Sequence, residues 1–241
     1  MKQLKLVSSL FVSTLLLSST AFAHTSLKGE MMPVAAYNWT GFYAGLNAGA
    51  VNHTMNITDV QATAFHSTIQ QVSNPRFSGG LQAGYRRQLD LNYVSGVYGV
   101  EMDANFSNAS FSKEYGSSFA IYQLSSKNVL NTVCLLELIG GIAADRTLLF
   151  LAAGLSWANI AGSTTNLDDV AFFNSFNVNK KEVGTALGAG IEYAFNEKIS
   201  ARIKVDVITP NTYSTYDNTG DIFQISNAIV QGTLGINYKF A

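Results

Sequence analysis

The chain has 241 residues, of which 13% are charged and 12% are aromatic, with 15 Phe, 11 Tyr and 20 Gly. This composition favours strands and tight packing over a soluble helical enzyme, and the formal net charge of −1 excludes a strongly basic nucleic-acid binder as the leading class. The single cysteine, Cys134, cannot form a disulfide within the chain, so an exported protein of this sequence needs another way to hold its fold, such as barrel closure.

The N-terminus has the pattern of a cleaved secretory signal. Lys2 and Lys5 make a positive start, and an apolar run from Leu6 to Leu17 is interrupted only by Ser and Thr. Ala21-Phe22-Ala23 matches the cleavage motif. The apolar run is shorter than the roughly 20 residues of a membrane-spanning helix, which disfavours an uncleaved anchor. The expected organisation is a signal peptide (1–23), a periplasmic leader (24–38) and a barrel (39–241).

Alternation of apolar with polar or small residues predicts eight strands after the leader. In chain order the expected strands cover residues 41–51, 77–89, 94–106, 130–142, 148–160, 183–195, 199–209 and 227–241. The seventh strand alternates most cleanly, with Ile203 and Val205 on one face and Arg202 and Lys204 on the other. A transmembrane helical hairpin over 133–161 is the alternative for the most apolar region, but a short polar stretch at 144–147 favours two strands.

The connections between these strands alternate in length. Residues 56–76, 107–124, 161–180 and 210–225 form four long polar connections, and residues 90–92, 145–146 and 196–198 form three short turns. Short periplasmic turns and long surface loops are typical of outer-membrane barrels, and each expected strand reaches the about 9 to 11 residues that a tilted membrane strand needs. In the fourth strand Asn131 and Glu137 are expected inward, and the fifth is expected to have a small inner face, from Ala152 to Ala158.

The first strand carries a more specific signal. Trp39-Thr-Gly-Phe-Tyr-x-Gly-x-Asn-x-Gly49, placed just after a signal peptide, resembles the opening of the OmpA-like transmembrane barrels and opacity-type surface proteins of Gram-negative bacteria. The resemblance implies an all-β fold, an eight-stranded antiparallel up-and-down transmembrane β-barrel in the cell outer membrane. A soluble lipocalin-type barrel, with the apolar face inside, is the rival. The signal peptide, the loop asymmetry and the aromatic C-terminus favour the membrane barrel.

Aromatic residues on the apolar faces are expected to form two girdles at the lipid interfaces. Those expected near the periplasmic edge are Phe42, Tyr85, Tyr193, Tyr238 and Phe240, and those near the outer edge are Phe106 and Trp157. The resemblance also implies that the barrel-assembly machinery reads the C-terminal strand. Relatives commonly end on the aromatic residue, whereas this chain adds Ala241. Outer-membrane lipid and lipopolysaccharide are the other expected partners.

Eight charged residues fall on the faces expected to point into the barrel. They are Arg86, Arg202 and Lys204 against Glu101, Asp103, Glu137, Glu192 and Asp206. Desolvation in a narrow interior forces such groups to pair, which predicts a structural plug of ion pairs. The alternative is a gate, in which exchange of partners opens a narrow path for small solutes or cations.

Catalysis has weak support, and no enzyme, cofactor or metal site is predicted. His53 and His66, with Asp59 as a partner acid, are the only candidates for an outer-membrane hydrolase or acyltransferase. No Walker, dinucleotide-binding or zinc pattern occurs. The expected function is therefore structural or adhesin-like, through loops that bind a host or matrix ligand. The loop aromatics that suggest it are Phe65, Phe172, Phe173, Phe176, Tyr213, Tyr216 and Phe223; the alternative is that these loops pack on each other.

Overall fold

The computed structural model describes residues 37–59, 68–72, 74–90, 95–117, 120–166, 176–216 and 222–240, so the expected signal peptide and most of the expected leader lie outside the described residues. The described chain forms ten strands: β1 (Gly41–Asp59), β2 (Thr68–Val72), β3 (Arg76–Asp90), β4 (Ser95–Ser117), β5 (Ala120–Ala144), β6 (Thr147–Asn166), β7 (Phe176–Ala194), β8 (Ile199–Pro210), β9 (Tyr213–Tyr216) and β10 (Ile222–Lys239).

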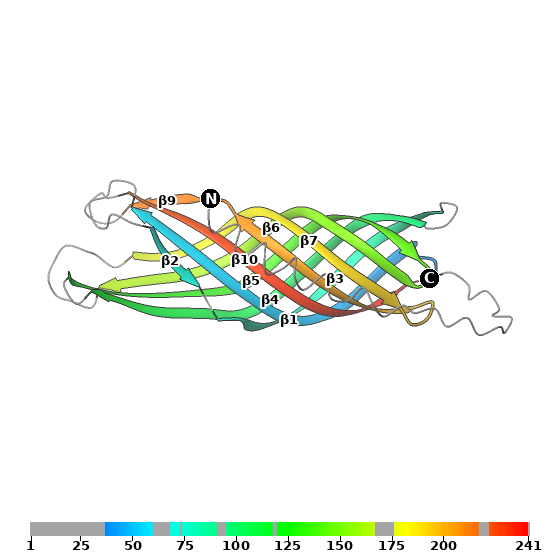
Figure 1. Cartoon of the computed structure of the whole chain (residues 1–241), viewed down its shortest axis with the longest axis horizontal. Coiled ribbons are helices and arrows are strands. Elements are labelled where there is room, and N and C mark those ends of the chain that lie inside the picture. The colour runs from blue at the N-terminus through cyan, green and yellow to red at the C-terminus, as the bar shows by residue number, and fades with distance from the viewer. Residues whose placement is uncertain are drawn as a thin grey trace, which may run out of the picture. The chain divides into compact units, whose positions relative to one another are not determined.

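Eight of these strands close into an antiparallel barrel, which confirms the expected fold class (Figure 1). Each long strand pairs with its neighbours in the chain, and β1 pairs with β10 from Tyr43↔Lys239 to Asp59↔Phe223. The backbone N–H of Phe240 donates to the carbonyl of Phe42 at 2.9 Å and extends this seam. The short strands β2 and β9 stand at the two ends of the strand order, beside β1 and β10.

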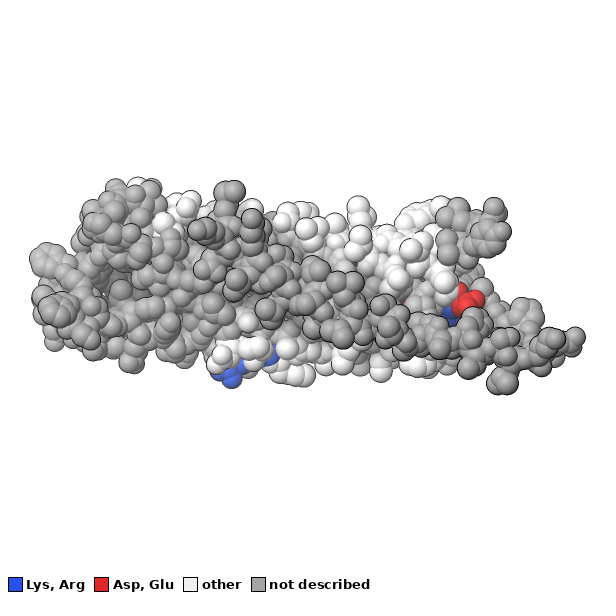
Figure 2. Space-filling view, viewed as in Figure 1, with Lys and Arg blue, Asp and Glu red and all other residues white. Residues whose placement is uncertain are grey.

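The apolar face of every long strand points away from the barrel interior. Leu46, Leu138 and Leu187 are 66%, 71% and 65% exposed, whereas Arg202 and Lys204, from the opposite face of β8, are 2% and 1% exposed. In Figure 2 most of the described surface carries neither acidic nor basic side chains. This arrangement is that of a membrane barrel and the reverse of a lipocalin-type barrel.

No helix among the described residues has the length and apolar character of a membrane-crossing segment. The region 133–161, for which a helical hairpin was the alternative, forms parts of β5 and β6 around a turn at Asp145 and Arg146. Asp145 has a φ of 51°, in the left-handed region that Asp tolerates in tight turns.

Several strands continue into stretches that were predicted to be loops. β4 extends to Ser117 and β5 begins at Ala120, so almost all of 107–124 is a paired ribbon. The ends of β6 and β7 occupy parts of 161–180 in the same way, and β2 and β9 lie within 56–76 and 210–225. The prediction failed there because the apolar alternation that marks a lipid-facing strand disappears where both faces are polar.

A β-bulge in β5 corrects the expected direction of Asn131. The register of β5 with β6 passes from Leu130↔Ile160 to Thr132↔Asn159, which leaves Asn131 unpaired and half-exposed instead of inward. The hydroxyl of Ser107 donates to the carbonyl of Leu130 at 2.8 Å beside it. Because of this extra residue, Leu130 and Val133 are both buried although they are three positions apart.

The barrel interior is filled in layers, which the order of residues along the strands makes clear. On β5, Glu137 lies between Leu135 on the loop side and Ile139 on the turn side. Leu135 belongs to one buried apolar cluster, Val51, Leu130, Val133, Leu135, Ala158, Ile160, Ala186, Ile208 and Ile229. Ile139 belongs to another, Tyr37, Trp39, Val97, Ile139, Ala143, Leu148, Phe150, Ala152 and Ala194.

The inner face of β6 is small from Ala152 to Ala158, as was expected, but it carries large residues nearer the turn. Leu148 and Phe150 are 0% and 3% exposed and fill the turn end of the interior. Gly190 of β7 makes room for the Phe150 ring, since a Cβ there would overlap the ring and the carbonyl oxygen of Ile203. Charged residues thus occupy the middle of the barrel, with apolar residues on both sides.

Candidate functional site

The structure places all eight predicted interior charges inside the barrel. Arg86 comes from β3, Glu101 and Asp103 from β4, Glu137 from β5, Glu192 from β7, and Arg202, Lys204 and Asp206 from β8; each is at most 2% exposed. They converge because side chains alternate between the two faces of a strand, and each of these residues lies an even number of positions from the other inward residues of its strand. We refer to these eight residues as the charge network.

Arg86 anchors the turn side of the charge network. Its guanidinium lies 2.7 Å from Glu192 and 3.5 Å from Glu101. The same group stacks on the Tyr43 ring, with 4.1 Å between Cζ and the ring centroid, and has the Trp39 and Phe150 rings at 5.9 Å. A desolvated guanidinium gains from both kinds of contact, which favours Arg over Lys at this position.

Arg202 connects the two carboxylates of β4. It forms ion pairs with Glu101 and, at 3.1 Å, with Asp103, and it donates to the Gln82 side chain at 2.7 Å. The Tyr43 hydroxyl donates to the same Glu101 carboxylate. Glu101 therefore accepts from groups on three different strands.

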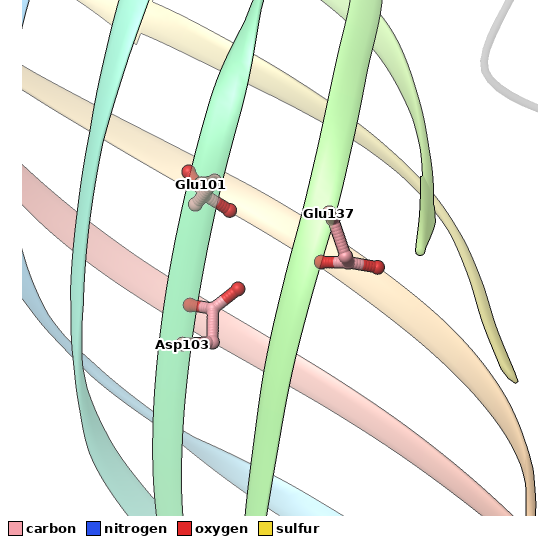
Figure 3. A group of neighbouring side chains, drawn as sticks. All are labelled: Glu101, Asp103 and Glu137. Carbon is pink, nitrogen blue, oxygen red and sulfur yellow. The ribbon is translucent and has the colours of Figure 1, made fainter. Parts of the chain in front are cut away.

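Lys204 lies at the centre of the loop side of the charge network. Its ammonium contacts Asp103 at 2.9 Å, Glu101 at 3.4 Å and Asp206 at 3.3 Å, and it also pairs with Glu137. Figure 3 shows Glu101, Asp103 and Glu137 converging from β4 and β5. One carboxylate oxygen from each lies within 4.8 Å of the others, a spacing that suits a bound cation. Here the side chain of Lys204 supplies the positive charge.

Neutral side chains, which were not among the predicted site residues, complete the charge network. Glu192 accepts from Ser200 and, at 3.0 Å, from Asn237. Gln82 donates to Asn237 at 2.6 Å and accepts from Asn47 at 3.0 Å. Their positions on the inward face were the available signal in the sequence. A buried charge requires an opposite charge, but a neutral amide at an inward position does not indicate which group it will bond.

The residues just before β1 close the turn end of the interior. The backbone N–H of Tyr37 donates to the carbonyl of Asp145 at 3.3 Å, and that of Trp39 donates to the Gln88 side chain at 2.9 Å. The side chains of Tyr37 and Trp39 are 8% and 3% exposed, and their rings meet edge to face at 4.6 Å. Burial raises the pKa of Tyr37 to about 12. Tyr37, the next-to-last residue of the expected leader (24–38), thus packs inside the barrel.

A second polar cluster lies toward the loop end, beyond the apolar layer that contains Val51 and Ile229. A ring nitrogen of His53 lies 3.0 Å from Asn227 Oδ1, and the Asn227 amide donates to both oxygens of Glu182 at 3.0 and 2.8 Å. His53 is fully buried. His66, the other candidate, and the side chain of Asp59, the expected partner acid, lie outside the described residues, so the catalytic hypothesis stays untested.

The seven aromatic residues predicted for the lipid interfaces all lie on the outer surface, from 37% exposed (Tyr85) to 66% exposed (Phe42). Phe42 packs on Tyr85 with 4.7 Å between ring centroids, and Tyr238 packs on Phe240 at 5.4 Å. Three more aromatics of the described chain lie on the outer surface, Phe77, Tyr98 and Phe195, which are 74%, 46% and 56% exposed. Tyr98 was expected to face outward, but none of the three was assigned to a girdle. They stand at strand ends, where alternation alone does not fix a boundary.

Comparison with known proteins agrees with this architecture. A family model described as "Outer membrane protein beta-barrel domain" matches residues 9–240. The 31 kDa outer-membrane immunogenic protein of Brucella melitensis is 27% identical over 213 residues, 86% of each chain, and the 25 kDa outer-membrane immunogenic protein of the same organism is 28% identical over 247 residues, the full length of both. The outer membrane protein OprG of Pseudomonas aeruginosa superimposes with a TM-score of 0.51 at 12% identity, over 85% of this chain and 98% of OprG.

Proposed function

Because this chain belongs to the family of outer membrane protein β-barrel domains, we propose that it is a closed, non-conducting barrel of the outer membrane whose loops serve surface interactions. The Brucella relatives carry the name outer-membrane immunogenic protein, which supports exposure of the corresponding loops at the cell surface. The role is structural or adhesin-like, with the barrel acting as a rigid support.

The observation that supports a closed barrel is the filling of its interior at three levels. A solute that entered from the loop side would have to displace the layer of Leu130, Leu135 and Ile208, which are all 0% exposed. It would next have to separate the ion pairs of the charge network, and a buried charge left without its partner costs roughly 3–5 kcal/mol. Tyr37 and Trp39 would then stand in its way at the turn end.

The alternative is a narrow gate for cations, and the composition of the charge network favours it to a degree. Five carboxylates face three cationic groups, so a path that opened by exchange of ion-pair partners would select cations. Conductance of the purified, folded protein in a planar lipid bilayer separates the two functions. We expect no channel events, whereas discrete cation-selective events would replace the closed barrel with the gate.

The adhesin-like role is tested on whole cells. Deleting residues 60–67, 167–175 or 217–221 in turn should reduce binding of the cells to host-cell monolayers or to matrix-coated surfaces. The matched control is Glu197→Gln in the turn between β7 and β8, at the opposite end of the barrel. Each variant is first shown to run differently on a gel with and without boiling, as a folded barrel does. Undiminished adhesion by all three deletions, with folded barrels at the surface, would end the adhesin-like interpretation.

A further inference from the structure

The charge network contains more acidic than basic groups. Its five carboxyls face three cationic side chains, and each of the eight residues is at most 2% exposed. If every group were ionised, two negative charges would remain without a counter-charge. Burying an unpaired charge away from water is so costly that an ionisable group in that position becomes neutral instead. Something other than the eight side chains must therefore balance the excess.

Three of the carboxylates are balanced by the three cations. The pairs are Arg86 with Glu192 at 2.7 Å, Arg202 with Glu101, and Lys204 with Asp103 at 2.9 Å. Asp103 also lies 3.1 Å from Arg202. The two acidic groups that remain are Glu137 and Asp206. Their cationic contact within the described chain is the same Lys204.

Glu137 lies among other carboxylates. It stands directly across from Glu101 of β4, and one oxygen each of Glu101, Asp103 and Glu137, the side chains of Figure 3, lie within 4.8 Å of one another. On its other side Glu137 faces Gly154 of β6, which offers neither a charge nor a side-chain donor. Its Oε1 accepts no hydrogen bond from a described residue. Carboxylates this close together do not all ionise in a dry interior.

Asp206 has a similar environment on β8. Its neighbours in register are Gly188 of β7 and Gln231 of β10, which are both uncharged. The carboxyl group lies against Gly188, where a Cβ would come within 2.3 Å of Asp206 Oδ1. That oxygen lies 3.3 Å from the Lys204 ammonium, and it too accepts no hydrogen bond from a residue that the structure describes. Besides Lys204, the charged groups that act on Asp206 are Glu137 and Asp103.

We propose that the folded barrel holds two protons inside the charge network, on Glu137 and Asp206, and that its interior is electrically neutral only while both are bound. A proton needs no space, whereas a metal ion requires several oxygen ligands around a centre that the Lys204 ammonium already occupies. The count of protons does not depend on what the loops bind or on whether the barrel conducts.

Two interior protons make the stability of the barrel depend on pH. In the unfolded chain both carboxyls face water and are ionised above about pH 5, so unfolding near neutral pH releases the protons. The folded state then binds more protons than the unfolded state, and its stability falls as the pH rises. The folding equilibrium constant should fall about tenfold per pH unit for each proton.

Infrared spectroscopy detects the protonated carboxyls directly. In the folded protein, kept in an ester-free detergent at neutral pH, we expect the carbonyl band of a neutral carboxylic acid. Glu137→Gln and Asp206→Asn should each reduce this band, because an amide has the shape of the protonated acid and does not ionise. Glu197→Gln, at an exposed carboxylate in the turn before β8, is the matched control and should leave the band unchanged. A folded parent without the band, or a band that neither interior substitution reduces, would overturn the proposal.

The same variants, once shown to have the folded gel mobility, are unfolded with urea in lipid vesicles at several pH values. Relative to the parent, Glu137→Gln and Asp206→Asn should each lessen the fall of the folding equilibrium constant by about tenfold per pH unit. Glu197→Gln should follow the parent at every pH, and the comparison between variants cancels the titration of histidines. A loss of stability in both interior variants with the parent's pH dependence retained would mean that the two carboxyls are only structural. The infrared band of the parent decides the question if a variant does not fold.

Discussion

At the scale of single residues, the interior depends most on Lys204, which pairs with four carboxylates from three strands. An apolar side chain of the same length cannot replace the Lys204 side chain. Its removal leaves Glu137 and Asp206 without the cation they pair with, while Glu101 and Asp103 keep only Arg202 and Arg86 as counter-charges. The cost of an uncompensated buried charge exceeds the net gain from a completed pair, so Lys204 acts as a condition for folding more than as a source of extra stability.

Lys204→Met should therefore lower the free energy of unfolding by roughly 3–5 kcal/mol, the range for breaking a buried ion pair. Urea titration of the folded protein in lipid vesicles, followed by tryptophan fluorescence, measures the change. Lys181→Met, at an exposed position of β7, is the control and should stay within about 0.5 kcal/mol of the parent. Equal stability of the two variants would show that the charge network contributes nothing.

The same substitution, Gly→Ala, should have opposite effects on stability at two positions of the barrel wall. A Cβ on Gly190 would overlap the Phe150 ring, whereas a Cβ on Gly232 would meet nothing within 4 Å. Gly190→Ala should therefore cost about 1–3 kcal/mol, as overpacking does, and Gly232→Ala should cost nothing or stabilise slightly. The same vesicle-based urea titration compares them. A larger loss for Gly232→Ala would contradict the assignment of the inner and outer faces.

At the scale of elements, the directions of the strands were predictable and their ends were not. Alternation placed Arg202 and Lys204 inward and Ile203 outward, because lipid and lumen impose opposite demands on the two faces of a strand. Above the membrane both faces meet water, so the continuation of β4 to Ser117 left no apolar signal. The bulge at Asn131 was also invisible, since one inserted residue alters parity without changing composition.

The bulge predicts an unusual tolerance to deletion. Without Asn131, Leu130 and Thr132 become neighbours, and Leu130 and Val133 still face inward. Deleting Asn131 should therefore leave a barrel that shifts in gel mobility on boiling. Deleting Leu136, in the regular part of β5, exchanges the lipid and lumen faces on one side of the deletion and should abolish the folded band. Two deletions with the same outcome would contradict the bulge.

At the scale of the whole molecule, the interior combines what the sequence indicated with what it hid. The eight charges were identifiable because charged side chains on a lipid-facing surface are too costly. Their partners were not, since pairs such as Arg86 with Glu192 join strands that are distant both in sequence and around the barrel. The apolar layers were missed for a different reason. Leu135 and Phe150 are apolar, and an apolar residue type alone does not distinguish a position inside the barrel from one that faces lipid.

The layered interior predicts that a substitution can lower the stability of the barrel without opening a path for ions. Trp39→Ala should cost about 3–5 kcal/mol, typical for a buried tryptophan, because the ring packs between Tyr37 and the guanidinium of Arg86. The planar bilayer should nevertheless stay silent, since the charge network and the layer around Leu135 remain. Channel events from this variant alone would mean that the segment before β1 is the only barrier.

The pairing of Arg86 with Glu192 and of Arg202 with Glu101 joins residues 106 and 101 positions apart. No such bond can form in an open sheet, because the partners face one another only after the wall has curled and β10 has met β1. The charge network is accordingly a late event on the folding path. Substitutions in the charge network should leave the rate of barrel formation nearly unchanged and should increase the rate of unfolding. The charge network inside the barrel therefore determines how long the folded barrel persists in the membrane.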